Sequence, residues 1–166
     1  MKNALAFLLC LTLAACGFHL RGIASLPFET LYVPSATGGI ALELKRNIQS
    51  GTATRVVDDV KRAEAQLQFI EETRLKEILS LTSGGRVREY RLIYRVGFRV
   101  ADGKGGEFLP ASTVALSRDV TYADAEVLAK ETEEQLLFRE MQADMVQQIM
   151  RRIAAASKPP ADAPAR

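Results

Sequence analysis

The stretch Arg88–Val100, with the sequence REYRLIYRVGFRV, alternates polar and apolar residues more regularly than any other part of the chain. A period of two is typical of a β-strand with one buried face, because successive side chains point to opposite sides of a sheet. The stretch therefore predicts a long strand. One face would carry Tyr90, Leu92, Tyr94, Val96, Phe98 and Val100, and the other Glu89, Arg91, Ile93, Arg95, Gly97 and Arg99.

Two further strand-like stretches flank this one. Gln66–Leu81 comes before it and is joined to it through the turn Ser83–Gly85, and Phe108–Tyr122 follows the glycine-rich loop Asp102–Gly106. Short loops with glycine between such runs are typical of hairpins, so we expect a three-stranded meander. All three runs exceed the common strand length of about 5–6 residues, which predicts bulges or frayed ends. Counting alternate residues in the first run places Leu67, Phe69, Thr73, Leu75, Leu79 and Leu81 on one face, and mainly Gln66, Gln68, Glu72, Arg74, Lys76 and Ser80 on the other.

The part of the chain before the meander is expected to supply one strand and one helix. Leu26–Val33 has the pattern of a strand that ends before Pro34. Ile40–Ser50 has apolar residues at every fourth position and is followed by glycine, which is typical of a helix and its C-terminal end. Arg55–Val57 is either a short strand or an edge segment.

A long helix is predicted after the meander, with Asp124 as its N-cap. Its Lys130–Gln135 part is polar on all sides, so it is a short separate helix, a kink, or a projection past the sheet. The order of elements predicts an α+β fold, a two-layer sandwich with two helices packed on one face of a roughly four-stranded mixed sheet. The core stripe of the long helix would be Leu137, Met141, Met145, Ile149 and Ile153.

Length and composition agree with one modest domain. The chain has 166 residues, of which 48% are hydrophobic and 25% are charged, as in an ordinary globular domain. Lys and Arg number 22 against 20 Asp and Glu, so the chain has no basic excess of the kind that nucleic-acid binding requires. We therefore expect no nucleic-acid partner.

The N-terminus resembles a bacterial lipoprotein signal. Lys2 precedes the apolar run Ala4–Leu13, which is too short to span a bilayer and fits a secretory signal. Small residues then lead to Cys16, as in a lipobox, although a plain signal peptide with a chance cysteine is the alternative. The resemblance implies diacylglycerol and an N-acyl chain on Cys16, no other cofactor, and, with Gly17 next, sorting to the outer membrane. The expected divisions are a signal peptide at 1–15, a lipidated tether at 16–25, one domain at 26–156 and a disordered tail at 157–166.

The sequence offers no candidate catalytic or metal-binding motif. The sequence contains no P-loop, no G-x-S-x-G and no Cys/His cluster with metal-ligand spacing. The one histidine, His19, lies three residues after Cys16 in the expected tether. We therefore expect neither an enzyme nor a metal site.

Two sets of basic residues remain as candidate binding sites. Arg91, Arg95 and Arg99 share the outer face of the Arg88–Val100 strand, and form either a solvated face or a docking surface for carboxylates or phosphates. The second set consists of Arg86, Arg88 and Lys130. If these residues lie together at one end of the sandwich, they hold an anionic headgroup; otherwise they are ordinary surface charges.

The segment Cys16–Gly22 (CGFHLRG) resembles the start of the mature members of the LptE family of lipopolysaccharide (LPS)-assembly lipoproteins. Glu89-Tyr90 is similar to the family's Glu-Tyr pair, and Ala129–Gln135 (AKETEEQ) resembles the stretch that opens its long helix. The resemblance extends over residues 16–153 and is strongest at the N-terminus.

The resemblance implies a non-enzymatic function at the outer membrane. Family members plug and help assemble the LptD β-barrel, so the domain would lie in the barrel lumen, anchored to the periplasmic leaflet. They also bind LPS, for which Lys130 is the best candidate, with Arg86 or Arg88 in place of a basic residue expected near the turn. The alternatives are an outer-membrane adaptor of another barrel-assembly machine, a carrier of small apolar ligands, and a lipid-anchored hydrolase.

Overall fold

The computed structural model of the protein describes residues 25–34, 38–121 and 127–158, with the side chains of the last helix described from residue 130 onward. The predicted signal peptide, Cys16, His19, Asp124 and residues 159–166 lie outside the described residues. The predictions made for them therefore stay predictions.

The meander forms as expected. Strand β3 (Ala65–Leu81), strand β4 (Val87–Ala101) and strand β5 (Glu107–Thr121) pair antiparallel in sequence order. The alternation in β4 predicted one buried face, and one face of this central strand does lie in the core. Five of the six residues predicted for that face are at most 1% exposed, namely Leu92, Tyr94, Val96, Phe98 and Val100.

The sheet has five strands rather than four. Strand β1 (Thr30–Tyr32) pairs in parallel with both strand β2 (Arg55–Val57) and β3, which gives the order β2-β1-β3-β4-β5. Arg55–Val57 is thus the edge strand of the sheet. Strand β1 is shorter than the predicted Leu26–Val33 because its ladders involve only three and two residue pairs. Its flanking residues Leu26, Phe28 and Val33 are nevertheless buried.

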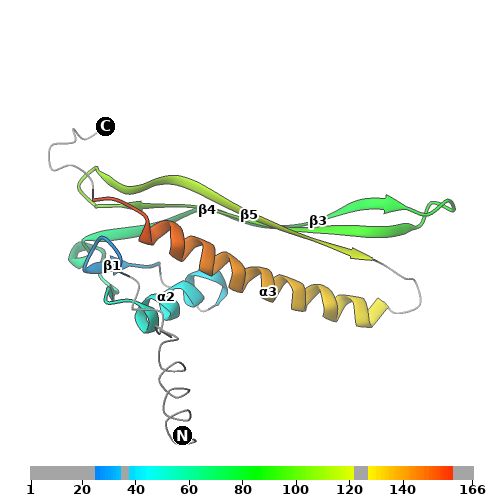
Figure 1. Ribbon diagram of the computed structural model, residues 1–166, viewed down its shortest axis with the longest axis horizontal. Helices are drawn as coiled ribbons and strands as arrows, with labels where there is room; N and C mark the ends of the chain where they lie inside the picture. The colour runs from blue at the N-terminus through cyan, green and yellow to red at the C-terminus, as the bar shows by residue number, and fades with distance from the viewer. Residues whose placement is uncertain (1–24, 35–37, 122–126, 159–166) are drawn as a thin grey trace, which may run out of the picture.

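Both helices cover the same face of the sheet, as predicted (Figure 1). Helix α2 (Gly39–Gly51) packs beside helix α3 (Val127–Ala154), and a 3₁₀ turn at Val60–Arg62 leads into β3. Helix α3 is continuous through the polar Lys130–Gln135 stretch, so this stretch is neither a separate helix nor a projection. Instead, the β3–β4 hairpin projects past the start of α3 (Figure 1). We call this end of the molecule the distal end, and the end with β1 and α2 the proximal end.

The predicted helical stripes are the ones that pack. Ile40, Leu44 and Ile48 of α2 are at most 1% exposed. In α3, Met141, Met145, Ile149 and Ile153 are fully buried, whereas Leu137 is only partly buried. Neither helix in the described part of the chain is both long and apolar enough to cross a membrane.

A β-bulge reverses the predicted faces in the distal half of β3. The pairing passes from Phe69↔Phe98 to Glu71↔Gly97, which leaves Ile70 as an extra residue. Beyond it, Arg74 lies opposite Tyr94 and therefore points to the helix side, although the count of alternate residues places it on the outer face. That count was wrong between the bulge and Ile78. A second register shift follows Ile78, and Ser80 lies opposite Glu89 on the outer face, as predicted. Glu72 and Lys76 move to the helix side with Arg74, and Leu75 and Leu79 stay 40% and 42% exposed.

Candidate functional site

Lys130 lies in the first turns of α3, at the distal end. Its Nζ is 2.7 Å from Oε2 of Glu133, one turn further along the helix, and its side chain is 20% exposed. Lys130 lines a small cavity between α3 and the sheet, together with Lys76, Tyr90, Leu92, Val120 and Glu134. The volume of this cavity is about 10 Å³, which is the space for one water molecule.

Lys76 of β3 reaches the same cavity from the sheet. Its Nζ lies 4.4 Å from the centroid of the Tyr90 ring and 2.5 Å from Oε2 of Glu134 on α3. An ammonium over an aromatic face is attracted by the ring quadrupole, so Tyr90 helps to fix where this charge lies. The sequence interpretation missed Lys76 because it placed this residue on the outer face. The signal that would have found it is the bulge at Ile70, of which Gly97 on the facing strand is an indirect trace.

Arg74 continues the polar contacts between α3 and the sheet. Its guanidinium lies 4.7 Å from the ring centroid of Tyr94 and 5.7 Å from that of Phe138, and Nη2 donates to Oε1 of Gln142 over 2.6 Å. The Tyr94 hydroxyl donates to Oε1 of Glu72 over 2.6 Å. Burial, and then this hydrogen bond to a carboxylate, raise the pKa of Tyr94, which holds the phenol as a donor. The contact between α3 and the distal half of β3 is therefore made largely by charged and polar side chains.

Arg86 and Arg88 lie at the same end as Lys130 but do not line its cavity. Arg86 closes the β3–β4 turn, where its backbone N–H donates to Oγ1 of Thr82 over 3.1 Å. Arg88 is an exposed residue near the start of β4. The hairpin that carries both projects beyond the first turn of α3 (Figure 1). The structure thus brings Lys130 together with Lys76, and not with either predicted arginine, in this cavity.

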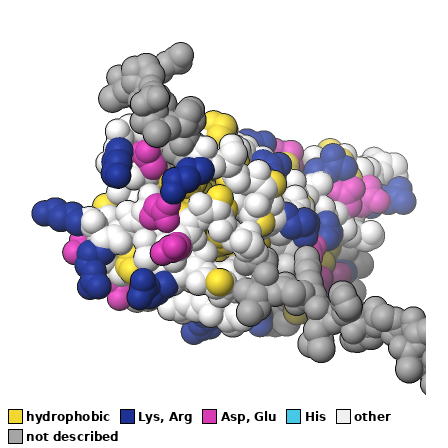
Figure 2. All heavy atoms as spheres, turned by 60° about the vertical axis from the view of Figure 1, so that its left-hand side comes forward, with side chains coloured by type: hydrophobic (Ala, Val, Ile, Leu, Met, Phe, Trp, Pro, Cys, Tyr) yellow, Lys and Arg dark blue, Asp and Glu magenta, His cyan; other side chains and the backbone are white. Residues whose placement is uncertain are grey.

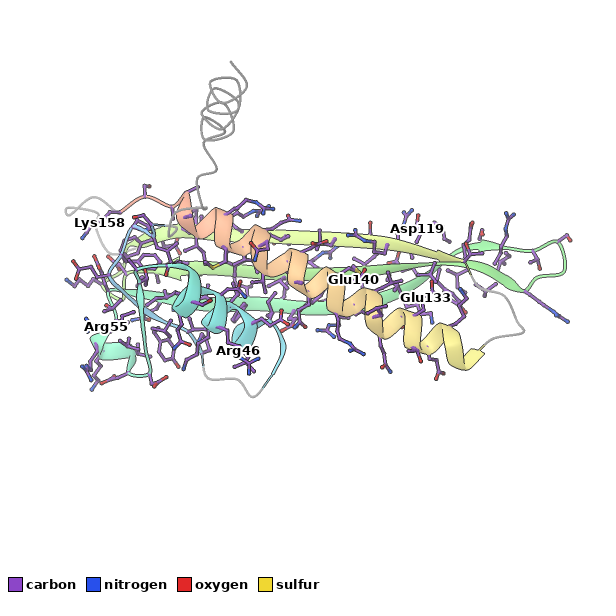
Figure 3. The ribbon with its side chains drawn as sticks, turned by 60° about the horizontal axis from the view of Figure 1, so that its bottom comes forward. Arg46, Arg55, Asp119, Glu133, Glu140 and Lys158 are labelled. Atoms are coloured by element: carbon purple, nitrogen blue, oxygen red, sulfur yellow. The ribbon has the colours of Figure 1, made fainter. Side chains whose placement is uncertain are left out.

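Arg91, Arg95 and Arg99 lie on the face of the sheet opposite the helices, as predicted. Arg91 donates twice to Asp119 of β5, over 2.8 and 2.9 Å. These hydrogen bonds raise the pKa of Arg91 and lower that of Asp119, which lies on β5 toward the distal end (Figure 3). Arg99 donates to Oε1 of Gln68 over 2.8 Å and to Oε1 of Glu107 over 3.4 Å. Two of the three predicted docking residues are thus already engaged within the sheet.

Arg95 differs from its two neighbours on this face. It is exposed, and its cross-strand neighbours on the sheet are Thr73 and Ala115, which carry no charge. Its side chain has neither a hydrogen bond nor an ion pair with any residue in the described ranges. Among the three arginines, Arg95 is therefore the one with its charge available to a partner.

The proximal end has an open cavity of about 770 Å³. Its lining comes from residues 25–29, residues 53–55, Glu64 and Lys158, and thus not from the space between the sheet and the helices. Figure 2 shows Lys, Arg, Asp and Glu side chains intermingled over this end, with hydrophobic side chains only in small patches. This placement and this charge do not favour the alternative of a carrier of apolar ligands. No group of three or more potential metal ligands occurs among the described residues.

One ion pair at this end ties the segment after α3 to the start of β3. Nζ of Lys158 lies 2.8 Å from Oε1 of Glu64, and the backbone N–H of Glu29 donates to Oε2 of the same carboxylate over 2.9 Å. The hydrogen bond from Lys158, and then the one from Glu29, lower the pKa of Glu64 from its ordinary 4.5. The pair also raises the pKa of Lys158 from 10.5.

We expect this contact to titrate on both sides of neutrality. Because the pKa of Glu64 is lowered on folding, its contribution to stability is present above the ordinary 4.5 and is lost as the pH falls through the folded-state pKa. The raised pKa of Lys158 gives a contribution that is present below 10.5 and is lost as the pH rises through the folded-state value. The ¹³C chemical shift of the Glu64 carboxyl, followed by NMR in acid, measures the first step.

Lys158→Ala should return the pKa of Glu64 toward 4.5. Lys104→Ala is the matched control, since Lys104 lowers the same pKa by charge alone and is the smallest of its causes. An equal shift in the two variants would show that the pair with Lys158 is not what holds the carboxylate.

A family model described as "LptE: Lipopolysaccharide-assembly" matches residues 28–153 of the chain. The LPS-assembly lipoprotein LptE of Pectobacterium atrosepticum is 25% identical over 145 residues, which cover 84% of this chain and 77% of the relative. The protein of the same name from Yersinia enterocolitica is 27% identical over 147 residues, which cover 86% and 70%.

Solved structures share the architecture. Lipoprotein B from Nitrosomonas europaea, solved by NMR in solution, superimposes with a TM-score of 0.72 at 40% identity and covers 84% of this chain and 91% of its own. The crystal structure of rare lipoprotein B from Shewanella oneidensis gives a TM-score of 0.65 at 27% identity, with coverage of 76% and 94%. The match with both extends over most of each chain, so the two-layer sandwich is common to these lipoproteins.

Proposed function

Because the chain belongs to the LptE family of lipopolysaccharide-assembly lipoproteins, we propose that it plugs and helps to assemble an LptD-type β-barrel and binds LPS on its way to the outer leaflet. The observation that carries this proposal is the family match over residues 28–153, which includes both layers of the sandwich. The family is named for an assembly step and not for a catalytic activity.

The proposed location is the periplasmic leaflet of the outer membrane, with the domain inside the barrel lumen. Diacylglycerol and an N-acyl chain on Cys16 would anchor the chain there, because several acyl chains give stable membrane attachment where one is marginal. This part of the proposal is supported by the lipobox-like sequence before Cys16 and by relatives that are named as lipoproteins.

The outer face of the sheet is the surface that we propose meets the barrel wall. The lumen of a large barrel is lined by polar residues, so a plug needs polar groups that face it. Arg95 offers an uncompensated charge for a carboxylate of the wall, whereas Arg91 and Arg99 are held by Asp119 and Gln68. We therefore expect Arg95 to contribute most of the three to partner binding.

We further propose that LPS binds at the distal end, through Lys130 with Arg86 or Arg88. What supports this is that the β3–β4 hairpin, which carries both arginines, and the first turn of α3, which carries Lys130, lie at one end of the sandwich (Figure 1). The resemblance of Ala129–Gln135 to the family adds to this support. Lipid A phosphates would be the groups recognised, because lysine and arginine are the common partners of phosphate in proteins.

Affinity purification of the tagged full-length protein from outer membranes, followed by mass spectrometry, tests the partner. We expect an LptD-type barrel as the main co-purifying protein, and a loss of at least about fivefold in its yield for Arg95→Glu, since a buried charge pair across an interface is costly to reverse. Arg46→Glu on α2 is the matched control, since Arg46 is also exposed but lies on the helical layer (Figure 3). Recovery of a different assembly machine would favour the adaptor alternative.

A further inference from the structure

We propose that Lys76 is a second phosphate-binding residue of the distal end, that Lys76 and Lys130 together bind one phosphate monoester of the glycolipid headgroup, and that Glu134 occupies its place in the free protein. This inference rests on the proposed function. It also changes the composition of the site, because the sequence pointed to Arg86 or Arg88 as the partner of Lys130.

Lys76 and Lys130 line the same cavity. Lys76 enters it from β3 and Lys130 from α3, and Tyr90, Leu92 and Val120 form its wall on the sheet side. Because both lysines line this one cavity, their positive charges would repel each other if they were not neutralised. In the free protein the neutralising groups are two carboxylates of α3, Glu134 for Lys76 and Glu133 for Lys130.

This cavity has no room for a second anion. A cavity of about 10 Å³ holds at most one water molecule, so a phosphate group cannot enter it beside the Glu134 carboxylate. Glu134 must therefore swing away when phosphate binds. Its side chain is 27% exposed and that of Lys76 is 38% exposed, and ion pairs with this much exposure to solvent contribute little to stability. An anion that binds Lys76 more tightly than one carboxylate does can therefore displace Glu134.

Phosphate has more charge and more acceptor oxygens than a carboxylate. A phosphate monoester carries a charge of about −1.5 to −2 near neutral pH and three strong acceptor oxygens. It can accept hydrogen bonds from both lysines at once, whereas each glutamate neutralises only one of them. The cation–π contact with Tyr90, over 4.4 Å, keeps the ammonium of Lys76 at the cavity when Glu134 leaves.

Arg74, the other cation that the bulge turns inward, does not join this site. Its guanidinium is already held by Gln142 and by the rings of Tyr94 and Phe138. It does not line the cavity. Of the two cations that the bulge turns toward the helices, Arg74 therefore takes part in packing and Lys76 in binding.

The experiment measures the affinity of the full-length protein in detergent for two probes, LPS with bisphosphorylated lipid A and the same LPS after enzymatic dephosphorylation. Lys76→Gln should weaken binding of the phosphorylated probe by about five- to tenfold. Glu134→Gln should strengthen it severalfold, because the competing carboxylate is removed. Lys45→Gln is the matched control. Nζ of Lys45 also has an ion pair, 2.8 Å from Oδ1 of Asp58, but this pair lies away from the distal end, so the variant should bind the probe like the wild-type protein.

The gain in Glu134→Gln is the decisive outcome, because a residue with a purely structural role would not improve binding when it is replaced. Lys76→Arg should restore most of the affinity, and thermal unfolding of each variant separates binding from folding. If the wild-type protein binds the phosphorylated probe and Lys130→Glu weakens it, but Lys76→Gln and Glu134→Gln change nothing, the inference is wrong and the proposed function stands. Equal binding of both probes would also overturn the inference. If the wild-type protein binds neither probe, the proposed LPS binding itself fails.

Discussion

Replacing Phe98 by alanine is expected to lower the free energy of unfolding by about 3–5 kcal/mol. Phe98 is fully buried near the proximal end of β4, on the face that both helices cover, and it pairs with Phe69 across the ladder. Removing the ring leaves a cavity in the layer between the sheet and the helices, and the surrounding strands can close it only in part. Urea unfolding followed by circular dichroism measures the change.

Ile93→Ala is the control for this prediction. Ile93 is also on β4 but on the outer face, where it is only partly buried, and we expect a loss of at most about 1 kcal/mol there. Similar losses for the two variants would mean that the outer face of the sheet is covered as well as the helix face. The covering would then have to come from self-association, which the concentration dependence of the unfolding midpoint would reveal.

How far the sequence predicts this fold depends on how long each pattern runs without interruption. The alternation over Arg88–Val100 is unbroken, so it identified the central strand and its buried face correctly. The helices were equally clear, because their apolar residues recur at helical spacing against polar neighbours. The two-layer arrangement then follows, since both helices need a sheet face on which to bury their apolar stripes.

The faces of β3 could not be predicted in the same way. One extra residue, Ile70, shifts the side chains from Glu71 to Ile78 to the opposite side, and apolar residues such as Leu75 occur where alternation would place the core. Gly97 lies opposite the bulge, where a Cβ would come within 2.9 Å of Cγ of Glu71. A glycine inside a strand is thus the one trace of the bulge in the sequence, but it does not say on which strand the extra residue lies.

The candidate site shows the same limit. The resemblance to the family singled out Lys130, and the structure places it at a cavity between two elements. Lys76 is far from Lys130 in sequence and belongs to the part of β3 whose face was mispredicted, so only the three-dimensional arrangement connects the two. Short parallel ladders are also hard to foresee, because strands of three residues such as β1 and β2 carry too few positions for a periodic pattern.

Lys130→Glu is expected to weaken LPS binding at least about tenfold and to leave the unfolding midpoint nearly unchanged. The side chain has one described ion pair, with Glu133 on the same helix, so little of the fold depends on it. The new carboxylate would lie beside Glu133 and near Glu134, which concentrates negative charge where an anionic headgroup has to approach. Titration of the purified full-length protein with labelled LPS, at low and at high salt, measures the loss and its electrostatic origin.

The same titration with Arg86→Glu and with Arg88→Glu tests the other two predicted cations against Lys130. Neither lines the cavity, so a headgroup held between α3 and β3 should lose less affinity in these variants than in Lys130→Glu. A larger loss for either arginine would move the site to the β3–β4 turn, where the sequence had also allowed it. An unchanged affinity in Lys130→Glu would remove Lys130 from the site altogether, and the cavity between the helix and the sheet would then be a structural contact of the family fold.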